Sequence, residues 1–317
     1  MLSLVNGCQK KDRINDKLRK KENNMYTENE KRTGIIQVLF TYIAWGFLPI
    51  FWKFLDEVPS FYVLFSRALW SLLFCVIYLT ILKKWPRIKA LFQDKNIVKR
   101  CLISGILICI NWGGYIWGVN GGHVLDCSLG YYLNPILGVI LGVLVFKEKL
   151  NKYEWTAVIL AVTGVLYLII KAGVIPGLSL LLAGSFGTYG LIKKGMEISS
   201  EESLFMETIL VSPIAVAFLI YSEVNGVGAT GILSGAEWML LPMAGIVTAI
   251  PLLIYSAGVQ KIPFYLAGMI MYLNPTIQFF LGVFLYKEPI DMDRIISFAV
   301  IWIGILIMTV GNLKKNK

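Results

Sequence analysis

The chain has 317 residues, of which 56% are hydrophobic and only 16% are charged, and its mean hydropathy is +0.67. This composition excludes an ordinary water-soluble domain. The apolar runs also lack the alternation of polar and apolar residues that a transmembrane β-barrel needs. The formal net charge of +10 would suit a nucleic-acid-binding protein, but the positions of the charges favour a membrane protein.

Residues 1–33 form a basic tail with no long apolar run, which fits neither a signal peptide nor a membrane helix, and we expect it to be disordered. Met25 is a second candidate for the start of the chain. Ten apolar segments follow, each long enough to cross a hydrocarbon core about 30 Å thick as a helix. The predicted helices are 34–54, 61–82, 101–120, 128–146, 155–172, 174–192, 204–221, 237–258, 264–286 and 295–312.

Lysine and arginine are concentrated in alternate loops. Nine of the thirty lie in the first 33 residues and seven in the loop 83–100, whereas the loop 222–236 has none. The positive-inside rule therefore places both termini and the 83–100 loop in the cytoplasm. The loop Lys287–Arg294 is an exception, because it would be external with two basic residues. The basic tail is then expected to contact anionic lipid headgroups and no nucleic acid.

A stretch of 20 residues recurs 140 positions further along the chain without a gap. Tyr131–Leu150 reads YYLNPILGVILGVLVFKEKL and Met271–Ile290 reads MYLNPTIQFFLGVFLYKEPI, with nine identical positions. The same offset relates Lys53 to Lys193 and Gly164 to Gly304. This self-similarity predicts two copies of one membrane unit.

Each copy contains five predicted helices, an odd number, so the second copy must begin on the opposite side of the membrane. The predicted fold is therefore an all-α integral membrane protein with ten transmembrane helices, arranged as two inverted five-helix repeats. The expected domains are the tail 1–33, the first repeat 34–172, the second repeat 173–312 and a cytoplasmic tail 313–317. Inverted repeats are typical of secondary transporters, and duplication for stability alone is the alternative.

Each repeat carries an Asn-Pro pair inside a predicted helix, Asn134-Pro135 and Asn274-Pro275. Proline leaves the carbonyl four residues earlier without its donor and tends to kink the helix. Such a break is tolerated in lipid only where it is buried in protein or lines a wet cavity. The asparagines then either bind a substrate or link neighbouring helices, and both interpretations place these helices near the centre.

The segment 101–120 carries a polar and aromatic run in which Asn111 and Tyr115 share a helical face and Trp112 lies beside it. Such surfaces suit flat, amphipathic or cationic small molecules, and an interfacial aromatic belt is the alternative for Trp112. The candidates for a substrate cavity are Trp45, Asn111, Trp112, Tyr115, Tyr131, Asn134, Tyr189, Pro251, Tyr255, Tyr272 and Asn274, with helix breaks at Pro49, Pro135 and Pro275.

Charged residues inside membrane segments are functional candidates by default. Lys53, Arg67 and Glu207 are the candidates for gating or coupling. Glu207 lies well inside a helix near the cytoplasmic face, which makes it the candidate for proton coupling. Lys53 can instead extend outward beside Asp56 and Glu57, and Arg67 can also reach the interface.

The sequence shows no catalytic or metal-binding cluster, because it has one His and five Cys without CxxC spacing. No glycine-rich phosphate loop of the GxxxxGK type occurs, so ATP-driven pumping is not supported. We therefore expect no enzyme activity, no cofactor and no metal.

The two halves resemble EamA repeats of the drug/metabolite transporter superfamily, and the detail resembles its RarD subgroup, named for chloramphenicol sensitivity. The matching stretches span residues 34–312 and are YIAWGFLPIFWKFL, SRALWSLLF, NWGGYIWGVNGGHVLDCSLGYYLNPILG, METILVSP, AGIVTAIPLL, YLNPTIQFFLGVFLYKEP and FAVIWIG. The resemblance implies ten helices and a central cavity lined mainly by the first, third, fourth, sixth, eighth and ninth. Members of the subgroup often carry Glu at the position of Asp126 and Gly at that of Asn274.

We therefore expect a multi-pass protein of the bacterial plasma membrane that moves a small organic metabolite or drug-like compound by alternating access. Export is the first hypothesis, and import or uncoupled facilitation is the alternative. A structural or sensory membrane protein without transport is the alternative from another class, and it predicts a dry centre. The oligomeric state, monomer or homodimer, is left open.

Overall fold

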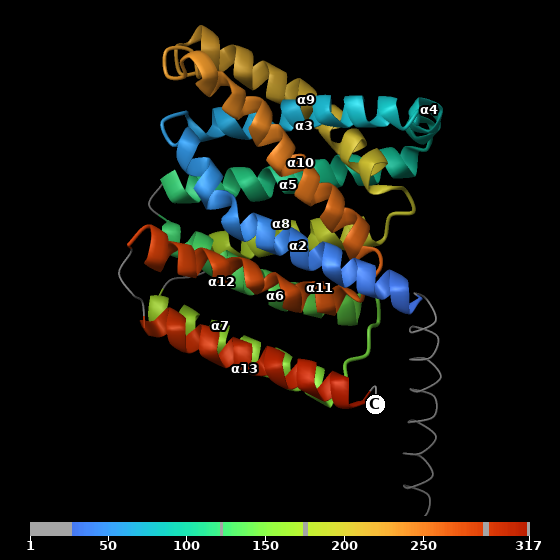
Figure 1. The fold of residues 1–317 in the computed structure, drawn as a ribbon, viewed down its shortest axis with the longest axis vertical. Helices are drawn as coiled ribbons and strands as arrows, with labels where there is room; N and C mark the ends of the chain where they lie inside the picture. Colours follow the sequence, from blue (N-terminus) through green and yellow to red (C-terminus); the bar gives the residue numbers. More distant parts are fainter. Residues whose placement is uncertain (1–26, 121–122, 174–176, 288–291, 316–317) are drawn as a thin grey trace, which may run out of the picture.

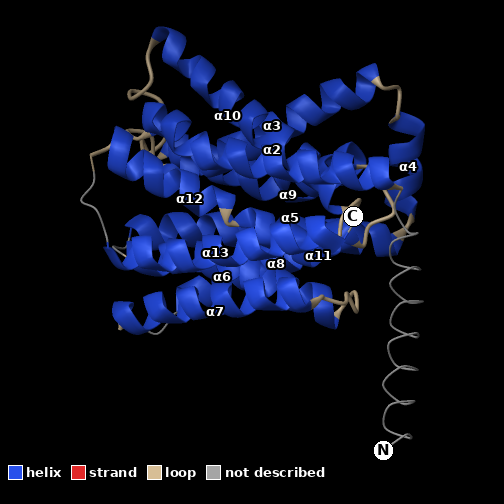
Figure 2. Ribbon diagram, turned by 60° about the horizontal axis from the view of Figure 1, so that its bottom comes forward, coloured by secondary structure: helices blue, strands red, loops and turns tan. Residues whose placement is uncertain are grey.

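The structure is a computed structural model that describes residues 27–120, 123–173, 177–287 and 292–315 (Figure 1). These residues form helices and connections, with no β-strand among them (Figure 2). The predicted disorder of the N-terminal tail falls mainly on residues 1–26, which lie outside the described residues. The helices are α2 (Glu28–Trp52), α3 (Ser60–Ile81), α4 (Trp85–Gln93), α5 (Lys95–Asn120), α6 (Val124–Leu144), α7 (Lys152–Ala172), α8 (Gly177–Lys194), α9 (Ser200–Val224), α10 (Leu240–Val259), α11 (Phe264–Met271), α12 (Leu273–Phe280) and α13 (Met292–Lys315), with short turns η1 (Lys53–Leu55), η2 (Gly235–Met239) and η3 (Leu281–Leu285).

Polar residues determine where several helices begin. α2 starts at Glu28, ahead of the apolar run, because Thr27 caps it. The Thr27 hydroxyl accepts from the backbone N–H of Glu30 at 3.2 Å, and the Glu30 carboxylate accepts from the backbone N–H of Thr27 at 2.8 Å. The same reciprocal cap joins Asn151 to Glu154 at the start of α7. Both caps satisfy backbone donors that a helix cannot satisfy itself.

Eight helices in the described part of the chain are long and apolar enough to cross a membrane, and Leu129–Leu144 within α6 is a shorter apolar helix. The predicted all-α membrane fold is confirmed. α6 and α8 are the long helices outside that group of eight, and they pack against each other and against α5. The count of ten crossings stays a prediction, which requires that these two helices also span.

Equivalent helices of the two repeats run in opposite directions. The turn that follows α10 contacts the start of α2, where Lys261 Nζ donates to Gln37 Oε1 at 3.1 Å. The same turn contacts the end of α8, where Lys194 Nζ donates to the Ile262 carbonyl at 2.5 Å. α2 therefore starts where α8 ends, although the repeat offset makes them equivalents. The second repeat is inverted relative to the first.

Contacts between the two repeats come in symmetric pairs, in which equivalent residues make the same contact from the opposite repeat. The carbonyl of Gly164 in α7 accepts from the Ser297 hydroxyl of α13 at 2.9 Å, while Gly304 of α13 lies against Ala157 of α7. Each residue of the first contact is the repeat equivalent of one in the second. Figure 1 shows α7 and α13 side by side at one end of the molecule. α3 with α9 and α6 with α11 are further pairs of equivalent helices in contact.

The lysine of the repeated Lys-Glu pair has the same backbone conformation in both copies. Lys147 and Lys287 have positive φ values of 54° and 59°, a left-handed conformation uncommon for residues other than glycine. In the first copy this conformation directs Glu148 to the N-terminus of α11, where its carboxylate accepts from the backbone N–H groups of Phe264 at 2.6 Å and Tyr265 at 2.9 Å. The motif thus ties the end of α6 to the start of its equivalent helix. Glu288 lies outside the described residues.

Gly245 of α10 is a point of close backbone approach between the repeats. A β-carbon there would lie 2.7 Å from the carbonyl carbon of Trp70 and 2.9 Å from the backbone nitrogen of Ser71, whereas a β-carbon at Gly184 would meet no atom within 4 Å. We expect Gly245→Ala to lower the free energy of unfolding by about 1–3 kcal/mol through overpacking. Gly184→Ala should leave it unchanged or raise it, because alanine favours helix. Thermal unfolding in detergent measures both variants, and equal melting temperatures would contradict this packing.

Candidate functional site

A cavity of about 530 Å³ lies between the two repeats. Its wall includes residues from α2, α5, α6, α8, α10 and the pair α11 and α12, which together form the ninth predicted helix. These are the six helices that the resemblance implies, and α3 contributes as well. The lining residues are Tyr42, Trp45, Leu48, Pro49, Trp52, Lys53, Leu55, Asp56, Ser60, Val63, Leu64, Arg67, Asn111, Trp112, Tyr115, Ile116, Tyr131, Asn134, Phe186, Thr248, Met271, Asn274, Pro275, Gln278 and Tyr286. Lys53, Asp56 and Tyr286 are solvent-exposed and mark the open end of the cavity.

Most of the residues that the sequence singles out lie on this wall. They are Trp45, Pro49, Lys53, Arg67, Asn111, Trp112, Tyr115, Tyr131, Asn134, Asn274 and Pro275. Six others lie outside the lining, namely Pro135, Tyr189, Glu207, Pro251, Tyr255 and Tyr272. Sequence reasoning missed Trp52, Phe186 and Gln278. Gln278 had a usable signal, since it is a polar residue inside an apolar helix at the position where the first repeat has Gly138.

Arg67 extends from α3 into the cavity and packs against two tryptophans. Its Cζ lies 4.0 Å from the centroid of the Trp112 ring and 5.3 Å from that of Trp52. Its Nε is buried without a hydrogen-bond partner within the described part of the chain. Among the described residues, the guanidinium is therefore held by cation–π contacts, and no ion pair with a carboxylate is found there.

The open end carries one ion pair. Lys53 Nζ lies 2.5 Å from Asp56 Oδ2, with the two side chains 67% and 48% exposed. The hydrogen bond from Lys53 lowers the pKa of the Asp56 carboxyl below its usual value. Among the described residues that line the cavity, Lys53, Asp56 and Arg67 are the charged ones. Because Lys53 and Asp56 neutralise each other, the lining keeps one positive charge.

The two asparagines of the Asn-Pro pairs differ in their hydrogen bonding. Asn274 Oδ1 accepts from Gln278 Nε2 at 2.7 Å. Asn134 is 5% exposed, and its Oδ1 has no hydrogen-bond partner among the described residues. Asn111 instead links helices, because its Nδ2 donates to the Leu182 carbonyl at 2.8 Å and to the Ser185 hydroxyl at 3.1 Å. Asn134 thus offers an acceptor to a bound molecule.

The two prolines have different effects on the backbone. α6 continues through Pro135 without interruption. In the second repeat the chain leaves regular helix at Tyr272, so that α11 and α12 are separate. Met271, whose carbonyl Pro275 leaves without a donor, lines the cavity. Regular helix is thus interrupted beside the Asn-Pro pair in the second repeat and continuous in the first.

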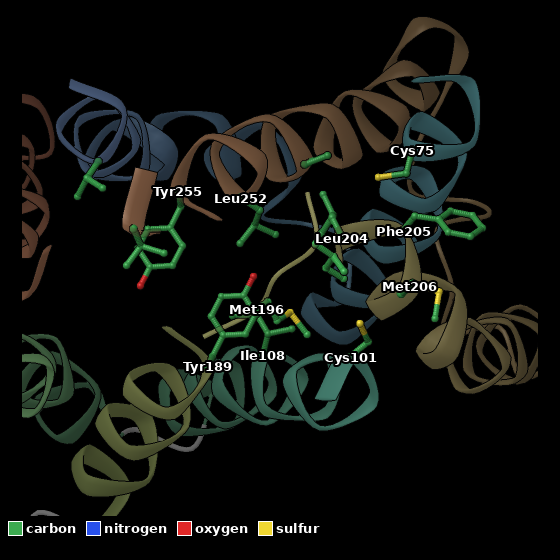
Figure 3. Close-up of a cluster of buried hydrophobic side chains, with 14 of the residues drawn as sticks. Cys75, Cys101, Ile108, Tyr189, Met196, Leu204, Phe205, Met206, Leu252 and Tyr255 are labelled. Atoms are coloured by element: carbon green, nitrogen blue, oxygen red, sulfur yellow. The ribbon is translucent and has the colours of Figure 1, made fainter. Parts of the chain in front are cut away.

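Aromatic side chains separate the cavity from the opposite, closed end. Tyr42, Trp45, Phe186, Tyr189 and Tyr255, here called the aromatic plug, contact one another with ring centroids 5.5–6.4 Å apart. Tyr189 and Tyr255 are 0% and 1% exposed, and Figure 3 shows them within a cluster of buried side chains from several helices. Because Tyr189 and Tyr255 are inaccessible to solvent, the plug closes this side of the cavity.

A buried ion pair lies beyond the plug. Lys193 Nζ is 2.6 Å from Glu207 Oε1, and the two side chains are 1% and 3% exposed. The same carboxylate oxygen accepts from the hydroxyls of Ser104 at 2.7 Å and Ser203 at 3.0 Å. This cluster joins α5, α8 and α9. A pair so satisfied is strongly destabilised by the loss of one partner.

Further polar contacts close the same end. Lys84, between α3 and α4, donates to Glu201 of α9, and this hydrogen bond raises the pKa of Lys84 above its ordinary value. Arg100 donates to the Gly195 carbonyl at 3.1 Å. Gln260 donates to the Lys193 carbonyl at 3.2 Å. The closed end is thus held by contacts between different helices, whereas the ion pair at the open end joins residues three positions apart.

The EamA-like transporter family matches the chain twice, over residues 32–170 and 175–310. The uncharacterized transporter YojE of Bacillus subtilis is 40% identical over 91% of this chain and 97% of its own length. Protein RarD of Streptomyces exfoliatus is 35% identical over 92% of this chain and 93% of its own length. Protein RarD of Escherichia coli is 33% identical over 91% of this chain and 97% of its own length.

One solved crystal structure has the same fold, with a TM-score of 0.69 at 15% sequence identity over 88% of this chain and 98% of the other. At that identity the likeness concerns the fold alone. The sequence matches carry the assignment further, because they span both repeats at 33–40% identity. The chain therefore belongs to the EamA-like transporter family and is a multi-pass bacterial membrane transporter of the drug/metabolite superfamily.

Proposed function

We propose that the protein is a secondary transporter that moves a small organic solute by alternating access, with the central cavity as the binding site. One observation carries this proposal. The cavity lies between two inverted repeats, is open at one end, and is sealed at the other by the aromatic plug and the Lys193–Glu207 pair. Its volume of about 530 Å³ suits a metabolite or drug-sized molecule. A structural or sensory protein would have no use for such a wet centre.

Inverted symmetry supplies the second state of the cycle. If the first repeat adopts the conformation of the second, and the second adopts that of the first, the open end closes and the closed end opens. Opening requires the plug to separate and the Lys193–Glu207 pair to part. We therefore assign this pair to the gate of the closed end, and Glu207 remains the candidate through which a proton gradient acts.

We further propose that both termini are cytoplasmic, so that the open end faces outward. The proposed physiological direction is export of a metabolite or drug-like compound, which loads from the cytoplasm and leaves from the state described. The alternatives are import and uncoupled facilitation, in which the outward-open form receives the solute.

Single-cysteine labelling tests the orientation. In a variant without native cysteines, Asn225→Cys lies in the connection after α9 and Lys89→Cys lies in α4, and both sites are exposed. In intact cells a membrane-impermeant maleimide should label Asn225→Cys and should reach Lys89→Cys only after permeabilisation. The reverse pattern would place the termini outside, and equal labelling would contradict the inverted topology.

Substrate affinity tests the cavity. Reconstituted liposomes identify the solute that the wild-type protein moves best from a metabolite panel. Trp112→Ala and Asn134→Ala should each weaken its apparent affinity about tenfold or more, because each removes about 1–3 kcal/mol of contact. Trp117→Ala is the matched control, since Trp117 is in the same helix but 58% exposed and outside the cavity lining. Unchanged affinity in both cavity variants would exclude this site.

Reversal of the ion pair tests the gate. Glu207→Gln and Lys193→Gln each leave a buried charge unpaired, so each should cost about 3–5 kcal/mol of stability and reduce flux. Combining Lys193→Glu with Glu207→Lys retains the attraction and should recover part of both quantities. Thermal unfolding and liposome flux measure them. No recovery, or normal flux in the single variants, would contradict the gating role. Gradient-driven uptake that persists in Glu207→Gln would assign proton coupling to another group.

A further inference from the structure

We propose that the transported solute is an organic anion with a flat apolar body, and that Arg67 binds its carboxylate or phosphate group. The inference rests on the proposed function and specifies the substrate class of that site. It narrows the range of possible substrates, because the aromatic surfaces alone would also suit a cationic solute.

The charge of the cavity is the first support. Lys53 and Asp56 form a pair at the open end, and Arg67 is the remaining charged residue among the described residues of the lining. A cationic solute would meet a net positive wall in a site partly shielded from water, where like charges repel strongly. An anion would neutralise the wall.

Unsatisfied hydrogen bonds are the second support. Arg67 Nε is buried with no partner in the described part of the chain, and the same is true of Asn134 Oδ1. A guanidinium offers five donors in a planar fork that matches a carboxylate or phosphate. Asn134 offers an acceptor for a hydroxyl, amine or amide elsewhere on the same solute. Both atoms belong to residues that line one cavity.

The neighbouring rings hold the guanidinium in place. Trp112 lies 4.0 Å from Arg67 Cζ and Trp52 lies 5.3 Å from it. Rings at these distances restrict the arginine by cation–π contact while contributing no hydrogen-bond acceptor that would compete with an anion. The remaining aromatic wall, including Trp45, Tyr131 and Phe186, suits an apolar ring or chain attached to the anionic group.

Comparison of the repeats gives the third support. The offset of 140 residues relates Lys193 to Lys53 and Glu207 to Arg67. At the closed end these positions hold a cation and an anion 2.6 Å apart. When the open end adopts the closed arrangement, the equivalent positions bring Arg67 toward Lys53, and Asp56, which balances the net charge of Lys53, is exposed and so screens this repulsion only weakly. Closure without a solute is therefore opposed by repulsion, and a bound anion between the two cations removes that opposition.

This charge pattern makes the anion a part of the gate. The anion occupies in the first repeat the place that the Glu207 carboxylate occupies in the second. The loaded carrier can then close its open end, while the empty carrier closes it more slowly. The apolar body of the solute contributes binding affinity, and its anionic group removes the repulsion that opposes closure.

Binding of matched probes tests the solute charge. The probes are phenylacetate, its neutral amide phenylacetamide, its cationic counterpart phenethylamine, and phenyl phosphate, with the purified full-length protein in detergent. Thermal stabilisation and tryptophan fluorescence report binding. We expect one or both anions to bind at least about tenfold more tightly than phenylacetamide, and phenethylamine to bind weakest. The two anions distinguish a carboxylate site from a phosphate site.

Substitutions at Arg67 identify the residue responsible. Arg67→Gln should abolish the preference for the anions over phenylacetamide, and Arg67→Lys should restore part of it. The melting temperature of each variant without probe serves as the folding control. Equal binding of phenylacetate and phenylacetamide by the wild-type protein, no anion binding at millimolar concentration, or an unchanged preference in Arg67→Gln would each overturn the proposal.

Arg67→Glu tests the role in closure. This variant places a carboxylate opposite Lys53 and so reproduces the charges of the closed end. We expect the open end to close without solute, so that a cysteine introduced at Ser60, on the cavity wall, reacts with maleimide at least about tenfold more slowly than in Arg67→Gln. Equal reaction rates would contradict the gating role of the anion. If solute flux depends on Trp112 but not on solute charge, the present inference fails while the proposed function stands; if no panel solute is moved, the proposed function fails.

Discussion

The structure depends on close backbone contact between helices that cross at repeat-equivalent positions. In lipid, apolar side chains gain little by leaving one apolar surroundings for another, so helix association relies on packing and on polar contacts. Here Gly164 and Gly304 bring α7 and α13 together, and Gly245 brings α10 against α3. Each contact leaves no room for a β-carbon without displacement of backbone or side-chain atoms. These crossings fix how the helices of the two repeats meet.

The same symmetry that builds the scaffold also shows where the two repeats have diverged. Scaffold positions are kept, as the paired glycines and the left-handed Lys147 and Lys287 illustrate. Residues at the two ends of the cavity differ between the repeats. The second repeat has the ion pair of Lys193 and Glu207 where the first has the two cations Lys53 and Arg67. A duplicated protein with two identical ends would have no means of treating them differently. The divergence gives each end its own chemistry.

Sequence alone was sufficient for the membrane fold, because helix length, hydropathy and the 140-residue offset are properties of the chain itself. It also indicated eleven of the 25 residues of the cavity wall, since polar and aromatic residues inside membrane helices are rare enough to be informative. It could not separate equivalent-looking side chains. Asn111 and Asn134 have the same side chain. Asn111 donates two hydrogen bonds to α8, whereas Asn134 Oδ1 accepts none among the described residues.

Long-range partners explain the remaining differences. Glu207 is paired with Lys193, fourteen positions away in a different helix, and Arg67 packs on Trp112 from α5. Neither partnership follows from local spacing, because each depends on how two helices cross and on which rotamer each side chain adopts. Gln278, which satisfies Asn274 from one helical turn away, is the contact that a closer comparison of the repeats would have found.

The interruption at Tyr272 gives the two repeats different versions of the same helix. Tyr272 keeps helical backbone angles, with φ −59° and ψ −16°, and its N–H donates to the Met269 carbonyl three residues earlier, whereas α6 continues through Pro135 as one regular helix. The Asn-Pro pair alone therefore does not interrupt a helix, because the identical pair is present in both repeats.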